Sequence, residues 1–454
     1  MPFSISRGYI MPKKSRIILN SIVVLLVLIV CCSNELYALE QDQQRLWTAQ
    51  QSIDYALQNN PDSRIAAIRI DAARARIDKA RSSLYPHLDF TTEYGQTDNA
   101  MGSFGNILQQ GNFDSSINFN EPGTTDNLSL QAELRYRLYS GGKKDASVSR
   151  ARFSRKRLSH DYVATINRLE FEVVRVFYQI ILAEETIAAR RSALQAIKAS
   201  LHVARARLEA GDLLRQHLLD LEVQHARASE DLIEARHALR LLQHGFNNLL
   251  GIPEGPVHID TKGSPAQKVP QKQDISSRSE LKSIDKSIAA AQQSLIVARS
   301  YKLPKIDGFA RYQYDRGFID NGDGGSWMTG VALRLPLADG GLTSAKTQEA
   351  KAAIRELKEK RRKTKLLLGL ELQQARQDLQ QAKQSMAVTV KMVQLAQESA
   401  RLSRARFKEG LVLSSDLIET ERRLTDALLR NSQAKSRHRI AIANLRKTIG
   451  LHQF

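Results

Sequence analysis

Cysteine is almost absent from this chain. The 454 residues include only two cysteines, the adjacent Cys31 and Cys32. Both lie in an N-terminal stretch that has the features of a secretory signal. A mature chain without thiols has no disulfide framework, no cysteine-ligated zinc and no thiol redox chemistry.

Motifs that carry catalysis are missing as well. The chain has no GxxxxGK[ST] phosphate loop, no HExxH zinc motif and no GxSxG nucleophile turn. The segment Asp320 to Gly325 begins like a calcium loop, but its third position is Gly322 and its twelfth is Val331. A glycine-rich loop tip is therefore expected there. We predict that the protein is not an enzyme and holds no cofactor and no metal.

Residues 1–38 are predicted to be a signal peptide. Basic residues precede an apolar run from Ile22 to Cys32, which is too short to span a bilayer comfortably, and Ala38 offers a small residue before cleavage. A lipoprotein signal would place a small residue before the acylated cysteine, whereas Val30 precedes Cys31. The alternatives left open are a start at Met1 or Met11 and lipidation of Cys31 or Cys32.

Acidic residues are outnumbered by basic ones. The formal charge is +19, and removing four basic residues and one acidic residue with the signal leaves +16. Such a balance is typical of nucleic-acid binding. Here the basic residues alternate with acids along helices, and the chain is exported, so no nucleic-acid partner is expected.

Proline and glycine are sparse, and their positions reveal an internal repeat of the sequence. Gly141, Gly211 and Gly251 recur 199 residues later as Gly340, Gly410 and Gly450, each in a similar local sequence. A fixed offset of this length indicates two copies of one structural unit. The predicted first repeat (39–251) contains hairpin 87–139, long helix 143–209 and return helix 216–249. A linker (252–276) follows. The predicted second repeat (277–454) contains hairpin 305–338, long helix 343–408 and C-terminal helix 416–447.

Each long helix carries an apolar heptad seam. In the first copy the seam runs from Ile166 to Leu208 in steps of seven, and in the second from Leu372 to Phe407. This 3.5-residue period predicts left-handed supercoiling against neighbouring helices.

The hydrophobic period changes to two after Pro86 and Pro304. Between Leu128 and Leu138 the even-numbered residues are apolar and the odd-numbered ones polar. The same alternation in three other segments predicts two hairpins, although Phe309 is out of phase. Apolar-out, polar-in strands of about ten residues in an exported chain favour an outer-membrane barrel. Four strands cannot close one, so several chains must share it.

These features together resemble the TolC-type outer-membrane channel family of tripartite efflux pumps and type I secretion systems. The resemblance covers nearly the whole mature chain. It rests on AsnAsnPro at Asn59 to Pro61, the helix-to-strand prolines Pro86 and Pro304, the glycine pairs Gly141–Gly142 and Gly340–Gly341, and the helical hairpins interrupted at Gly211 and Gly410.

The resemblance implies a fold, a location and partners. The expected fold is mainly α with a small β part: two repeats of long coiled-coil helices plus two β-hairpins. A homotrimer would form a 12-stranded β-barrel in outer-membrane lipid, continued by a periplasmic α-helical barrel. The implied partners are a periplasmic adaptor and an inner-membrane transporter. A periplasmic coiled-coil scaffold without a barrel is the alternative.

The resemblance also points to the helical tips. Asp416 and Glu419 match the family's acidic positions after Gly410, and Asp220 follows Gly211, whereas His217 departs from the pattern. Three copies of these carboxylates would ring a periplasmic aperture and attract cations. Asp416 and Glu419 also have the spacing of a helix capping box. Apolar residues occupy the positions where the family would place polar groups that lock the aperture: Leu208, Leu213, Phe407 and Val412.

Overall fold

The structure is a computed structural model that describes residues 46–118, 120–260 and 267–454. The predicted signal peptide and residues 261–266 of the predicted linker lie outside these ranges. The described residues fall into two compact units: unit 1 comprises 46–61, 167–260, 267–272 and 373–454, and unit 2 comprises 62–166 and 273–372. Each unit contains segments of both repeats.

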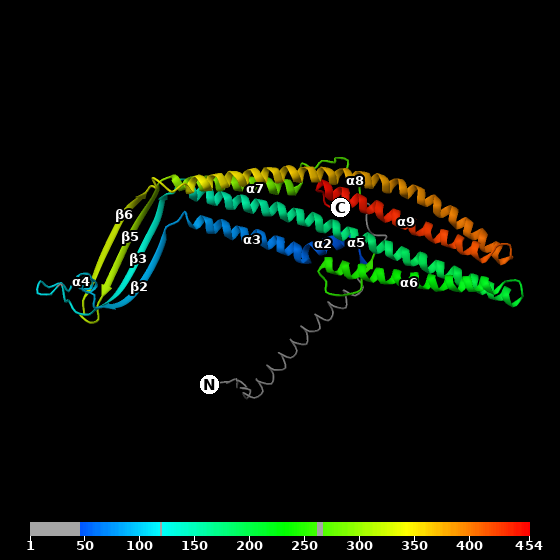
Figure 1. The fold of residues 1–454 in the computed structure, drawn as a ribbon, viewed down its shortest axis with the longest axis horizontal. Helices are drawn as coiled ribbons and strands as arrows, with labels where there is room; N and C mark the ends of the chain where they lie inside the picture. Colours follow the sequence, from blue (N-terminus) through cyan, green and yellow to red (C-terminus); the bar gives the residue numbers. More distant parts are fainter. Residues whose placement is uncertain (1–45, 119, 261–266) are drawn as a thin grey trace, which may run out of the picture. The chain divides into compact units, whose positions relative to one another are not determined.

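Helices dominate both units (Figure 1). The helices are α2 (Ala49–Asn59), α3 (Pro61–Ser82), α4 (Ala100–Gln109), α5 (Lys143–Glu209), α6 (Arg215–Leu250), α7 (Ser279–Arg299), η1 (Ser300–Lys302), α8 (Leu342–Lys408) and α9 (Ser414–Ile449). The strands are β1 (Leu46–Trp47), β2 (His87–Thr97), β3 (Thr125–Tyr139), β4 (His258–Ile259), β5 (Lys305–Arg316) and β6 (Asp323–Arg334). The predicted class, mainly α with a small β part, is confirmed.

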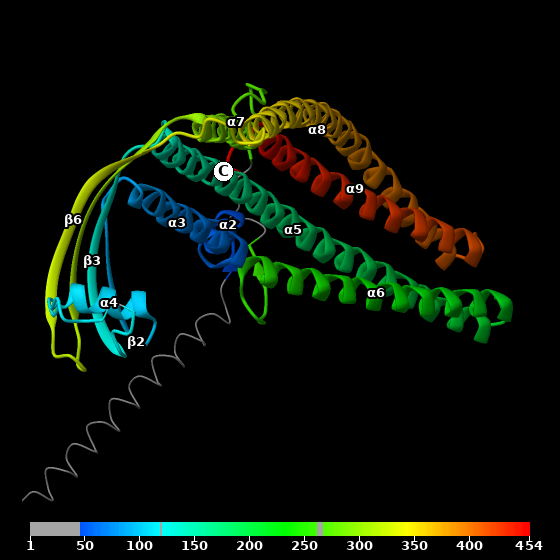
Figure 2. The same cartoon turned by 60° about the vertical axis from the view of Figure 1, so that its left-hand side comes forward.

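The sheet of unit 2 contains four antiparallel strands in the order β2-β3-β5-β6. Figure 2 shows these strands curving together. The two predicted hairpins are joined by pairing of β3 with β5, so strands from both repeats form one sheet. Each strand turns its apolar alternate residues to the same face, where Phe90, Trp327 and Val331 remain between 68% and 76% exposed. A monomer therefore presents a large apolar sheet face to its surroundings.

Phe309, which breaks the alternation, lies on the polar face opposite Gly330. A Cβ added at Gly330 would lie 3.0 Å from Cζ of Phe309. The aromatic ring thus covers the space that glycine leaves empty, a pairing that keeps strand register. The out-of-phase residue does not interrupt β5.

The predicted hairpin 87–139 also contains a helix that the sequence analysis did not predict, α4, between β2 and β3. Asn99 caps α4 through its side-chain oxygen, and the amide of Gln110 donates 2.6 Å to the carbonyl of Asp126. The opposite turn is rich in glycine because Gly322 and Gly324 lie against the backbone of Gln109 and Gln110. Strand β6 begins at Asp323, inside the segment that was expected to form a loop tip, and ends at Arg334 instead of continuing to residue 338.

The landmark prolines and glycines stand at the passages between helix and strand. Pro86 and Pro304 immediately precede β2 and β5, and each glycine pair immediately precedes a long helix. Gly141 adopts φ +62°, and a Cβ there would lie 2.6 Å from Cβ of Leu303. Only glycine permits this close approach of the two passages.

Unit 1 has two apolar clusters. The larger surrounds Trp47, Phe177 and Phe246, all at most 3% exposed. The AsnAsnPro segment is linked to this region by Asn60, whose side-chain amide donates a 2.9 Å hydrogen bond to the carbonyl of Leu249. Along α5 and α8 the heptad seam residues are buried or half-buried throughout. Across the described ranges, no helix combines the length and apolarity that a membrane crossing requires.

Candidate functional site

Two helical hairpins in unit 1 carry the predicted site residues. α5 turns into α6 at Gly211, and α8 turns into α9 at Gly410, with φ of +82° and +78°. At the second turn Gly410 N–H donates 3.1 Å to the Phe407 carbonyl, and Leu411 N–H donates 2.9 Å to the Arg406 carbonyl. The first turn repeats both bonds. This pattern is the Schellman motif, which requires a left-handed residue and therefore favours glycine.

An ion pair closes each hairpin behind its turn. Arg205 contacts Glu222 at 3.1 Å in the first hairpin, and Arg404 contacts Glu421 at 2.7 Å in the second. Both residues of each pair obey the 199-residue offset. Glu421 is the more enclosed, with 4% of its side chain exposed, and its hydrogen bonds raise the pKa of the Arg404 guanidinium. Each pair connects the two helices of its hairpin.

An apolar cluster joins the two hairpins at their tips. Its buried members are Leu201, Ala204, Leu221, Phe407 and Leu417, with Leu213 and Val412 packed against them. Of the four apolar tip residues noted in the sequence, Phe407 is therefore buried in this cluster, and Leu213 and Val412 pack against it, at positions where the family pattern would place polar groups.

Polar contacts reinforce this cluster. The Arg207 guanidinium lies 5.7 Å from the Phe407 ring centroid and donates to two carbonyls, that of Phe407 at 3.1 Å and that of Asp212 at 3.0 Å. His217 Nδ1 lies 2.9 Å from Ser414 Oγ. His217, which departs from the family's acidic pattern, thus connects the two hairpins.

Asp416 and Asp220 are both exposed, Asp416 on the first turn of α9 and Asp220 beyond the first turn of α6. Neither side chain has a hydrogen-bond or ion-pair partner within the described residues. The capping-box interpretation of Asp416 is wrong, because α9 begins at Ser414 with Leu413 as its N-cap and no side chain caps it. Asp416 instead lies inside the first turn, where the helix dipole favours a negative charge. No direct contact joins Asp416, Glu419 and Asp220.

Glu419 differs from these two aspartates because its carboxylate is bound on both sides. Arg422 donates at 2.8 and 3.0 Å, and Arg423 donates at 2.8 Å. These hydrogen bonds lower the pKa of Glu419 to about 2. The spacing of three and four residues on one helix could have predicted these pairs. Of the three predicted aperture acids, Glu419 is therefore compensated, whereas Asp416 and Asp220 are not.

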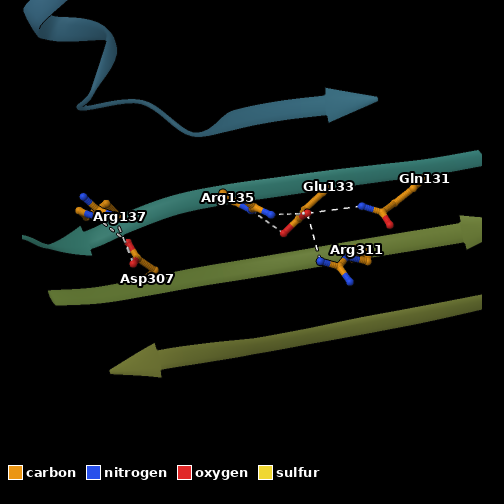
Figure 3. A network of polar contacts seen from close by, with 6 residues as sticks. All are labelled: Gln131, Glu133, Arg135, Arg137, Asp307 and Arg311. Atoms are coloured by element: carbon orange, nitrogen blue, oxygen red, sulfur yellow. Dashed lines mark hydrogen bonds and ion pairs between the residues drawn. The ribbon is translucent and has the colours of Figure 1, made fainter. Parts of the chain in front are cut away.

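A second group of charged residues, which the sequence analysis did not single out, lies on the polar face of the sheet (Figure 3). Glu133 accepts hydrogen bonds from Arg135 at 2.6 and 2.8 Å and from Arg311 at 3.2 Å, and only 8% of its side chain is exposed. Arg137 donates 2.7 Å to Asp307 on β5. These contacts tie β3 to β5 and make this face charged, opposite the apolar one. Within the described ranges there is no cluster of three or more His, Cys, Asp or Glu side chains that could hold a metal ion.

Comparison with known proteins identifies relatives along almost the whole chain. The family described as Outer membrane efflux protein matches residues 52–251 and 272–451. Protein CyaE of Bordetella pertussis is 25% identical over 87% of this chain and 81% of its own. The alkaline protease secretion protein AprF of Pseudomonas aeruginosa is 24% identical over 87% of this chain and 83% of its own.

A solved structure shares the fold. The CmeC outer membrane channel of Campylobacter jejuni superposes with a TM-score of 0.78 at 16% identity, covering 89% of this chain and 86% of that one. At this identity the likeness shows the fold alone.

Proposed function

This chain belongs to the outer membrane efflux protein family, and from that premise we propose that three copies close one 12-stranded barrel in the outer membrane and continue it through the periplasm as a helical tunnel. Family membership makes the chain an outer-membrane exit duct of an efflux or secretion system and not an enzyme. Most of the chain then lies in the periplasm.

The observation that carries the proposal is the pair of free sheet edges. Among the described residues, neither β2 nor β6 pairs with a strand on its outer side. Unpaired edges of 11 and 12 residues are templates for further pairing. Since the four strands alternate in direction, β6 of one copy meets β2 of the next antiparallel. A membrane barrel needs at least about eight strands, which a single copy cannot supply.

The two faces of the sheet support the same arrangement. The exposed apolar residues suit contact with lipid, and the Glu133 network suits a water-filled lumen. Tyr85, Tyr136 and Tyr139 at one end of the sheet and Tyr94, Tyr312 and Trp327 toward the other are exposed, as aromatic residues are at the two membrane interfaces.

In unit 1 the hairpin tips would form the periplasmic end, around Gly211 and Gly410. There the adaptor would contact the turns, and an inner-membrane transporter would deliver the cargo. Asp416 and Asp220 would face the aperture with negative charge. Glu419, held by two arginines, would contribute its carboxylate within a net positive cluster.

Channel recordings test both the duct and the aperture. In planar bilayers under a KCl gradient, the purified protein should conduct, and Asp416→Ala should shift the reversal potential toward anions because three carboxylates near one axis are removed. Helicity and oligomeric mass should not change, since Asp416 makes no capping bond.

Asp426→Ala is the matched control for this variant. Asp426 is a carboxylate on the same helix, paired with Arg430 at 2.7 Å away from the tip, and its removal should leave the reversal potential where it was. Equal shifts in the two variants would place Asp416 outside the aperture, and a protein that never conducts would refute the duct.

A further inference from the structure

A cavity of about 1260 Å³ lies in unit 2 between the polar face of the sheet and the helices α3 and α5. It contains no residue of unit 1, and it is remote in sequence from the hairpin tips. Ten of its lining side chains are Arg or Lys and only three are Asp or Glu. A lining with such an excess of positive charge favours a negatively charged ligand.

The three acids do not neutralise the cavity. Glu133 is already bound by Arg135 and Arg311, and Asp307 by Arg137. The third acid, Asp89, interacts electrostatically with Arg135. Six lining cations have no carboxylate within ion-pair distance in the part of the chain that the structure describes: Arg76, Lys79, Lys143, Lys144, Arg150 and Arg334.

These six cations come from separate elements that converge on one space. Arg76 and Lys79 lie on α3, Lys143, Lys144 and Arg150 on the start of α5, and Arg334 at the end of β6. Burial, followed by the charge of Arg137, lowers the pKa of the Lys144 amine. A lysine whose charged form is disfavoured in this way gains from a bound anion.

We propose that this cavity is an anion-binding chamber of the channel, which takes cargo carrying several phosphate or carboxylate groups. The inference rests on the proposed trimeric channel, in which three such chambers would surround the lumen. Rings of Arg and Lys favour anions and phosphate in pores. Lipid phosphates are the poorer match, because the cavity adjoins the polar face of the sheet while lipid would contact the opposite, apolar face.

The chamber and the tips would then act with opposite sign. Carboxylates of Asp416 and Asp220 would favour cations at the periplasmic end, whereas the chamber would concentrate anions next to the barrel. The selectivity of the open channel between cations and anions would then depend on both the tip carboxylates and the chamber cations.

The test uses tripolyphosphate as the probe on the full-length protein in planar bilayers at low salt, where charge effects are least screened. Tripolyphosphate should reduce the wild-type conductance reversibly. The double variant Arg76→Gln/Arg150→Gln removes two lining cations, so its apparent Kd for tripolyphosphate should rise at least about tenfold and its reversal potential should move toward cations.

The matched control is Arg74→Gln/Arg152→Gln, which removes the same number of charges from the same two helices at exposed positions that do not line the cavity. Tripolyphosphate should block the conductance of this control variant as strongly as that of the wild type. A conducting channel that tripolyphosphate does not block, or one blocked equally in both double variants, would overturn the chamber while leaving the duct intact. A protein without conductance would overturn the duct and the chamber with it.

Discussion

Leu134→Arg is expected to abolish membrane-inserted protein, whereas Gln131→Arg, three residues away on the same strand, is expected to be tolerated. Leu134 pairs with Leu88 and Ala310 on the neighbouring strands, and it is 42% exposed on the apolar face. An arginine on a lipid-facing position costs about 2 to 4 kcal/mol at the bilayer midplane and less toward the interfaces. Three copies multiply that cost in a trimer.

Gln131 lies on the other face, where its amide is 3.5 Å from Glu133. An arginine there meets water and a carboxylate, so its cost should be small. The measurement is the yield of detergent-extracted oligomer from the outer-membrane fraction. Similar yields from Leu134→Arg and Gln131→Arg would show that the faces have been assigned wrongly.

Phe407→Ala is expected to loosen the tip by about 3 to 5 kcal/mol, the usual cost of truncating a buried phenylalanine. The side chain is 2% exposed at the centre of the cluster that joins the two hairpins. The variant also loses the contact between the ring and the Arg207 guanidinium. Hydrogen exchange of the amides around Gly211 and Gly410 should accelerate, while exchange around Trp47 in the larger cluster of unit 1 should not.

Leu208→Ala serves as the comparison for this variant. Leu208 occupies the equivalent position in the first repeat, but it is only half-buried. Its truncation should accelerate tip exchange much less. Unchanged protection of the tip in Phe407→Ala would show that the cluster does not hold the hairpins together.

Features that depend on hydrophobic periodicity or on the positions of glycine and proline could be predicted from the sequence. The alternation between Leu128 and Leu138 predicted which residues of β3 share a face, because successive side chains of a strand point to opposite faces. The offset of 199 residues located the turns at Gly211 and Gly410, since a left-handed position restricts the residue type. The strand order, with β3 next to β5, could not be predicted in the same way, because it depends on which strands of the two repeats pair with each other.

Features decided by tertiary contact were missed. Helix α4 contains Gly102 and Gly105, which lower helix propensity, and it is held by contacts such as that of Gln110 with the carbonyl of Asp126. The start of α9 was misplaced because Leu413 is a poor N-cap by type. The basic chamber was missed because its cations are dispersed along the chain, and only folding brings α3, α5 and β6 together.

The most direct test of the trimeric barrel is a cross-link between the free edges. Thr92 on β2 and Thr329 on β6 are both exposed, and within one chain two strands separate them, roughly 14 Å at about 4.8 Å per strand. The mature chain has no other thiol if the predicted signal is removed. Thr92→Cys is combined in turn with Thr329→Cys and Val331→Cys and treated with a short bismaleimide in native membranes. The barrel predicts a covalent ladder that ends at three chains and is absent from each single variant; no ladder in any combination, from a protein that purifies as a helical monomer without detergent, would contradict it.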